Sequence, residues 1–228
     1  MGMITTSTAY SADPHAAGLV GYVLNGESAR VPPERQGAMF DYVLASDGLY
    51  LNTERAELEV FYRIAPAEVR GLSPGRPAFN FWRLLVPGNL IEEVLRIATR
   101  YAEYSKETLF WLEHSELNPY DAGWLIRQPA QNRTTASCRP YEGQDEQYQR
   151  AIIEIHSHHS MPARFSATDN EDETGFRIYG VIGRLLEAPE IRLRVGVYGY
   201  FWEIPATWAL ELPEGLSDCN ENAEASEE

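Results

Sequence analysis

Cysteine and lysine are both scarce in this sequence of 228 residues. Its two cysteines, Cys138 and Cys219, are far apart, and neither belongs to a pair with metal-binding spacing. We therefore expect neither a disulfide scaffold nor a cysteine zinc site, and the low cysteine content fits a reducing cytoplasm. Lys106 is the one lysine among 19 basic residues, and there is no basic run. Because phosphate backbones are bound by clustered Lys and Arg, nucleic acid is not an expected partner.

Long apolar runs are also missing. No segment approaches the roughly 18 apolar residues of a membrane span, so no membrane association is expected. Met1 to Tyr10 contain no Lys or Arg and no apolar core, so this stretch does not predict a secretory signal. Apolar residues make up 44% of the chain, which is ordinary for a globular protein with a buried core.

Acidic residues dominate the charge, with 34 Asp+Glu against 19 Lys+Arg and a formal net charge of −15. Six of the acidic residues lie between Leu212 and Glu228, a segment without basic residues, so the chain without this segment has a net charge of −9. We predict that residues 211–228 form an acidic, disordered tail. The Gly-, Ser- and Pro-rich segment Gly71 to Pro77 indicates a linker. Residues 1–85 are therefore interpreted as an N-terminal extension of unknown role, and residues 86–210 as the main domain.

Hydrophobic periodicity predicts many strands and few helices. The clearest helix is 89–104, with Asn89 as N-cap and Glu92 in capping-box position. Strands are predicted at 19–24, 49–51, 57–64, 108–112, 123–127, 134–138, 151–156, 177–185 and 191–201. Residues 52–55 are predicted to form the turn that joins the strands 49–51 and 57–64. Short helices are predicted after Pro33 and near Thr168. Glycines 180, 183, 196 and 199 match no phosphate loop and indicate bulges or close backbone approach. This order of elements predicts an α+β or layered α/β/α fold.

The most informative segment contains His156-x-His158, then seven residues, then Ser166-x-x-Asp169. On an extended chain, residues two apart share a face and lie about 6.5–7 Å apart, so both imidazoles can approach one ion. Asp169 can supply an oxygen ligand. Three protein ligands leave a fourth position open, which is typical of catalytic zinc sites. Ser166 and Asp169 also fit a helix capping box, and we expect them to serve both purposes.

This motif resembles the JAB/MPN-plus signature of the JAMM zinc metalloproteases, over residues 86–204. The resemblance implies a cytidine-deaminase-like layered α/β/α domain with a mixed central sheet. It also implies Zn2+ on His156, His158 and Asp169, with Ser166 stabilising the oxyanion. Family members typically cut peptide or isopeptide bonds after the C-terminus of a ubiquitin-like protein, and others process sulfur-carrier proteins. A protein of either kind is the expected substrate.

A narrower resemblance is to the protein A family of the ParB-related, ThiF-related plasmid cassette, and it rests on residues 156–169, 177–183 and 193–199. This resemblance implies a ThiF-like adenylating partner. One departure from the wider family is His159, which stands where Pro usually follows the second His. His159 is expected to face away from His158. Two other hypotheses stay open: a non-catalytic scaffold that binds a ThiF-like partner, and a zinc hydrolase that acts on a small molecule.

The general base is the least determined residue. The family places a Glu at the head of an early strand, before a small residue and Leu-Leu-x-Gly, and Glu107 is the best match although Phe110 replaces the second Leu. Glu113 shares its strand parity but lies about 20 Å farther along. Glu154 precedes His156 by two residues and is an alternative base or a carboxylate that orients an imidazole.

Overall fold

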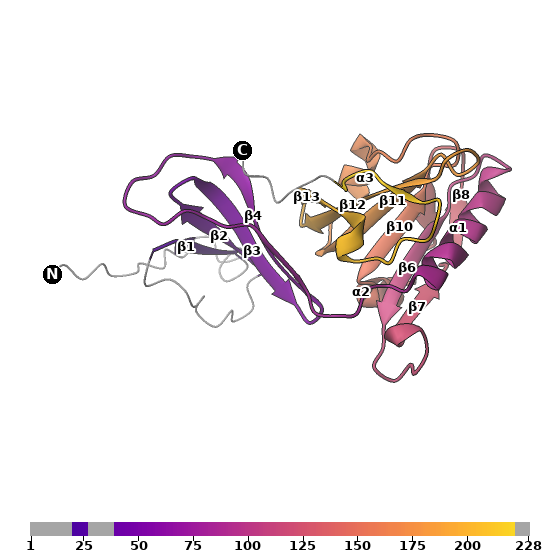
Figure 1. The fold of residues 1–228 in the computed structure, drawn as a ribbon, viewed down its shortest axis with the longest axis horizontal. Coiled ribbons are helices and arrows are strands. Elements are labelled where there is room, and N and C mark those ends of the chain that lie inside the picture. The colour runs from indigo at the N-terminus through magenta and orange to yellow at the C-terminus, as the bar shows by residue number, and fades with distance from the viewer. Residues whose placement is uncertain (1–19, 27–38, 222–228) are drawn as a thin grey trace. The chain divides into compact units, whose positions relative to one another are not determined.

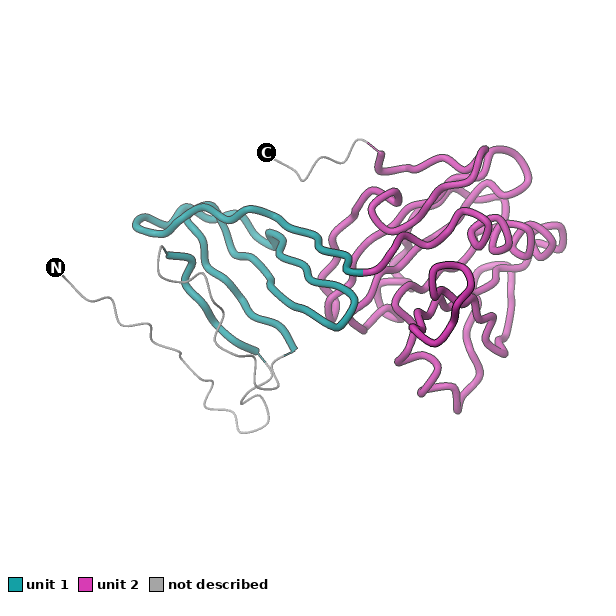
Figure 2. The backbone as a smooth tube through the Cα atoms, turned by 60° about the horizontal axis from the view of Figure 1, so that its bottom comes forward, with its two compact units in different colours: residues 1–82 teal, residues 83–228 magenta. Residues whose placement is uncertain are grey.

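The computed structural model describes residues 20–26 and 39–221, and the chain divides into two compact units, residues 1–82 and 83–228 (Figure 2). The loose arm expected over 1–18 and most of the short helix expected after Pro33 lie outside the described residues. The division falls between Trp82 and Arg83. The predicted linker, Gly71 to Pro77, is instead part of the connection between β4 and β5 within the first unit, because β5 pairs with β4. No helix within the described ranges combines the length and apolarity that a membrane span requires.

The first unit contains a five-stranded sheet whose strands follow one another in sequence order (Figure 1). Its strands are β1 Val20–Leu24, β2 Phe40–Ala45, β3 Gly48–Arg55, β4 Leu58–Pro66 and β5 Ala78–Phe81. β1 pairs with β2 in parallel, and the other pairs are antiparallel. The predicted turn over 52–55 is wrong, because these residues continue β3. Thr53 explains the error: this polar side chain is fully buried and donates to the Met39 carbonyl oxygen at 2.6 Å.

The second unit contains a seven-stranded mixed sheet in the order β13-β12-β11-β10-β6-β7, with β14 beside β12. β10 pairs in parallel with β11, as β12 does with β14, and the other pairs are antiparallel. The strands are β6 Leu109–His114, β7 Trp124–Arg127, β10 Ile153–Ser157, β11 Arg177–Gly183, β12 Glu190–Val197, β13 Tyr200–Ile204 and β14 Ser217–Asp218. A two-stranded sheet is formed by β8 Gln131–Arg133 and β9 Cys138–Pro140. Mixed sheets with few helices confirm the α+β class.

Three α-helices accompany these sheets in the described part of the chain: α1 Gly88–Ala102, α2 Asp145–Arg150 and α3 Ala167–Asp172. Short 3-10 turns occur at Asp121–Gly123 and Ala206–Trp208. Helix α1 buries Ile91, Val94, Ala98 and Ala102. Of the apolar residues whose spacing predicts this helix, Val94 and Ala98 are buried, whereas Leu90, Ile97 and Tyr101 are half-buried. The predicted Asn89 cap is wrong because the N-cap is Pro87, two residues earlier, and Asn89 lies inside the helix. The Asn89 amide instead donates to Asp121 at 2.9 Å.

Three other predictions differ from the structure of the second unit. The strand predicted at 134–138 is the turn between β8 and β9, and the one at 191–201 is two strands. Tyr198 and Gly199 separate these two strands, since both have positive φ angles, 48° and 92°. Part of the tail predicted to be disordered is folded: β14 pairs with β12, and Asp218 accepts from the Ala206 amide at 2.7 Å. Residues 222–228 lie outside the described ranges.

Strand register between β6 and β10 decides which side chains can form a site. Leu109 pairs with His156 and Trp111 pairs with Glu154. Because side chains alternate along a strand, these four share one face of the sheet. Phe110 and its partner Ile155, which alternate with these residues along the two strands, are fully buried on the opposite face. The predicted histidine motif therefore stands at the end of a central strand, on a face that also carries an indole and a carboxylate.

Candidate metal centre

His156 and His158 bring their Nε2 atoms to within 3.1 Å of each other. His156 is the fourth residue of β10, and His158 follows the strand's last residue, with its amide donating to the Ile182 carbonyl oxygen at 2.7 Å. The His158 Nδ1 atom lies 3.4 Å from the Pro162 carbonyl oxygen, which turns Nε2 towards His156. Both imidazoles are at least nine-tenths buried.

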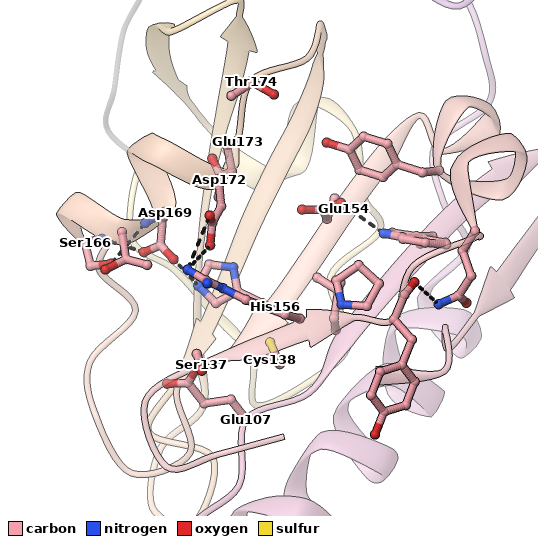
Figure 3. A pocket seen from close by; sticks show the side chains of 18 of the residues that line it. Glu107, Ser137, Cys138, Glu154, His156, Ser166, Asp169, Asp172, Glu173 and Thr174 are labelled. Carbon is pink, nitrogen blue, oxygen red and sulfur yellow. Dashed lines mark hydrogen bonds and ion pairs between the residues drawn. The ribbon is translucent and has the colours of Figure 1, made fainter. Parts of the chain in front are cut away.

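Asp169 is brought to these histidines by the start of α3. Its Oδ1 lies 3.4 Å from His156 Nε2, while Oδ2 accepts from the Ser166 amide at 2.5 Å. The Ser166 hydroxyl in return accepts from the Asp169 amide at 3.2 Å, which completes the predicted capping box. The cap therefore occupies one carboxylate oxygen and directs the other at the histidines (Figure 3).

Among the described residues, His156, His158 and Asp169 form a group whose three ligand atoms all lie within 4.8 Å of one another. Two imidazole nitrogens and one carboxylate oxygen are the donor set that zinc takes in sites with an open position. Burial lowers the pKa of both histidines, and Asp169 partly opposes this by favouring the charged form. Neutral imidazole is the form that binds metal, so both the geometry and the charge state fit zinc.

Glu107 lies just before β6, is 3% exposed and lines the same cavity as the two histidines and Asp169. Its amide donates to the Thr134 carbonyl oxygen at 3.0 Å, which fixes the backbone there. Burial and the negative charge of Asp169 raise the pKa of Glu107 to about 7. A carboxyl group with this pKa can accept or release a proton near neutral pH.

These residues line a cavity of about 410 Å³ within the second unit (Figure 3). Its walls come from β6, β9, β10, α2 and the segment 166–174, and they include Ser137, Cys138, Tyr148, Glu154 and Thr174. Burial raises the pKa of the Cys138 thiol, as does the charge of Glu107. Cys138 is therefore a neutral wall residue at physiological pH.

Comparison with known proteins decides the family. A sequence profile described as prokaryotic homologs of the JAB domain matches residues 81–196, about half of the chain. The chain belongs to this family. The resemblance read from the histidine motif is thereby confirmed at the level of the JAB domain, a family that includes catalytic and non-catalytic members and often binds zinc.

No match was found among the curated proteins. Among solved structures, the solution structure of a protein from Desulfitobacterium hafniense matches with 17% identity and a TM-score of 0.36. That match covers 58% of this chain and 95% of the other.

The structure separates the three carboxylates that compete for the role of base in the JAB domain. Glu107 and Glu154 both line the cavity. Glu113 does not, and its Oε1 pairs instead with the Arg127 guanidinium at 2.6 Å. The Glu154 Oε2 atom accepts from the Trp111 indole at 2.9 Å, and burial raises its pKa to about 7. His159 is half-buried, has a φ of 31° and contacts Ser160 and the Thr135 carbonyl oxygen rather than the three ligands.

Sequence reasoning missed the arginine that holds α3 against the sheet. Arg194 of β12 donates to Glu173 at 2.6 and 2.8 Å and to Asn170 at 2.6 Å, all within or just after α3. Its guanidinium also stacks on Phe165 and Phe201, at 3.8 and 3.7 Å from the ring centroids. In sequence, Asp169 thus lies between Phe165 and Asn170, which both contact this arginine. In sequence, Arg194 is one of two arginines in β12, and no local pattern marks it.

Proposed function

We propose that this chain is a zinc-dependent metallopeptidase or isopeptidase with a cytidine-deaminase-like layered JAB domain. The observation that carries the proposal is the convergence of His156, His158 and Asp169 within 4.8 Å, in a cavity that also holds Glu107. A structural zinc site would use four protein ligands and leave no cavity beside it. Here three ligands face open space and a carboxyl group whose pKa is near neutrality.

His156, His158 and Asp169 would hold the ion, and a bound zinc would acidify water and polarise the substrate carbonyl. Glu107 takes the proton from the attacking water at its carboxylate and passes it to the leaving amine. Ser166 uses its oxygen as an acceptor in the helix cap, so its hydroxyl proton stays available to the oxyanion. Asp169 and Ser166 are positioned together by one cap, and a single element therefore orients a ligand and an oxyanion donor.

The proposed substrate is the C-terminal tail of a ubiquitin-like or sulfur-carrier protein, and a ThiF-like adenylating enzyme is the proposed partner. The resemblance of the motif to JAMM proteases and to the plasmid cassette supports this choice. The cavity of about 410 Å³ beside the ligands can accept part of an extended tail. The alternative is a non-catalytic scaffold for the ThiF-like partner, which the departures around Phe110 and His159 favour.

Zinc content tests the proposal first, on full-length protein purified without a metal-binding tag. We expect about one zinc per chain in the wild type, and a loss of affinity above about 100-fold in His158→Ala, since even outer-shell partners change affinity 10–100-fold. His159→Ala is the matched control and should keep its zinc, because His159 lies outside the ligand group. Absence of zinc from reconstituted wild type would exclude the catalytic hypothesis and leave the scaffold.

A further inference from the structure

Glu154 lines the cavity but has no role in the proposed reaction. Glu154 lies two residues before His156 on β10, on the same face, about 6.5–7 Å along the strand. Because Leu109 pairs with His156, Glu107 lies beyond His156 on the side away from Glu154. Figure 3 shows Glu107 and Glu154 on opposite sides of His156. A group bound by Glu154 would therefore lie beside the reacting centre without blocking the proposed base.

The Glu154 carboxylate is held in a fixed position. The Trp111 indole donates to its Oε2 at 2.9 Å, and Trp111 is itself fully buried and packs on Tyr148 with ring centroids 5.6 Å apart. No other hydrogen bond and no ion pair to Glu154 occurs among residues 20–26 and 39–221. The nearby cation Arg177 acts on the charge of Glu154 without pairing with it directly. Its guanidinium stacks 3.7 Å from the Tyr148 ring centroid and donates to the Tyr148 carbonyl oxygen.

The other carboxylates of the cavity already have partners or roles. Glu173 pairs with Arg194 at 2.6 Å, and Asp172 pairs with Arg139 at 3.0 Å. Asp169 is a proposed ligand and Glu107 the proposed base, while Asp145 is exposed at the cavity margin. Glu154 is thus left as a cavity carboxylate that no cation of the described residues contacts by a hydrogen bond or an ion pair. An enclosed charge of this kind is unfavourable until a cation approaches it.

We propose that Glu154 forms a subsite for a basic side chain of the substrate, a lysine or arginine within one or two residues of the scissile bond. The inference rests on the proposed function, because the metal ligands set where that bond lies. The Glu154 Oε1 atom, which has no partner among the described residues, accepts the charged N–H donors. Half-buried Tyr148 and exposed Tyr141 line the same cavity and cover the alkyl stem of the side chain. The preferred substrate is therefore a tail with a basic residue near its end.

A pair of capped pentapeptides tests the subsite: acetyl-Gly-Gly-X-Gly-Gly-amide, with X either arginine or citrulline, its uncharged isostere. The zinc-loaded full chain is titrated with each while the indole N–H resonance of Trp111, assigned with Trp111→Phe, reports on the Glu154 carboxylate. We expect the arginine peptide to bind at least about tenfold more tightly, as for a charge-assisted pair in an enclosed site. Equal affinity for both peptides would overturn the inference.

Glu154→Gln should abolish that preference, and Glu92→Gln should keep it. Glu92 is exposed on α1 and outside the cavity lining, so this control removes the same charge elsewhere. An unchanged preference in Glu154→Gln would also overturn the inference. If the chain takes up no zinc, the proposed function fails, but the same comparison on the metal-free chain still decides the subsite. If Glu154→Gln does not fold, the arginine and citrulline comparison in the wild type decides it.

Discussion

Glu107 illustrates how position alone can change the chemistry of a carboxyl group. It is nearly fully buried at the start of β6, close enough to Asp169 for their charges to interact, and these two effects raise its pKa to about 7. Glu113 lies on β6 itself and pairs with Arg127 instead. Two glutamates six residues apart thus have different surroundings, and only Glu107 lines the cavity in which the proposed reaction needs a base.

We predict that Glu107→Gln keeps zinc and loses cleavage. The amide has nearly the same shape but cannot accept the proton, so the rate should fall by about 10²–10⁴-fold, the usual contribution of a general base. The rate is measured with a tail peptide as substrate, alongside zinc content. Glu113→Gln is the control and should cleave at the wild-type rate. Undiminished cleavage in Glu107→Gln would move the base to Glu154.

The pH dependence of metal binding should show that the histidines are buried. Burial lowers the pKa of both below the ordinary value of about 6.5, so protons compete with zinc only at more acidic pH. The affinity should therefore stay constant from pH 8 to about 6 and fall below that. Competition with a chromophoric chelator at each pH measures it. A decline that begins near pH 7 would mean that the imidazoles titrate as exposed groups do.

At the scale of elements, α3 is too short to be stable by itself, since isolated helices below about 12 residues are marginal. Its six residues are held by the Ser166 cap and by Arg194, which contacts Asn170 and Glu173. The loop after His158 is fixed in a different way. A Cβ atom at Gly183 would lie 2.3 Å from the Ala163 backbone nitrogen, so the glycine allows this loop to pass close to β11. The prediction of close backbone approach at Gly183 is confirmed.

We predict that Arg194→Met destabilises the fold and weakens zinc binding. It leaves Glu173 as a buried charge without a partner, which typically costs about 3–5 kcal/mol. It also releases the helix that carries Asp169. Urea denaturation measures the free energy of unfolding, and chelator competition measures zinc affinity. The double variant Arg194→Met, Glu173→Gln should recover much of the stability but not the affinity. A double variant with full zinc affinity would show that Arg194 does not position α3.

At the scale of the whole molecule, the site belongs to one unit. All three ligands and every residue that lines the cavity lie within residues 83–228. The core of that unit is the mixed sheet of seven strands, which includes fully buried residues such as Trp111, Ile155 and Leu193. The first unit has its own sheet and its own buried residues, among them Leu51, Leu58 and Val60.

We predict that residues 83–228 alone fold and bind zinc with the affinity of the full chain. The physical reason is that the ligands, the cap and Arg194 are all supported by strands of the same sheet. Circular dichroism through a thermal melt and chelator competition measure the two properties. A cooperative melt together with at least tenfold weaker zinc binding would show that the first unit contributes to the site.

Local pattern was sufficient for elements whose burial follows a simple period. The alternating residues of β4 and the helical stripe of α1 were predicted because each buries one face. Pattern failed where a polar residue is buried, as at Thr53, and where a turn interrupts an apolar run, as at Tyr198 and Gly199. Short elements such as α2, with no buried residue, left no signal that periodicity can detect.

The sequence by itself determined the donor set, because His156, His158, Ser166 and Asp169 lie within 14 residues and their spacing is a local property. It also determined the cap that orients Asp169, since capping acts over three residues. Only the tertiary structure separated Glu113, which lies outside the cavity, from Glu107 and Glu154, because their places depend on the register of β6 against β10. It also revealed Arg194 and Trp111, whose partners are 21 and 43 residues away. Contacts at such separation depend on strand pairing, which no local spacing encodes.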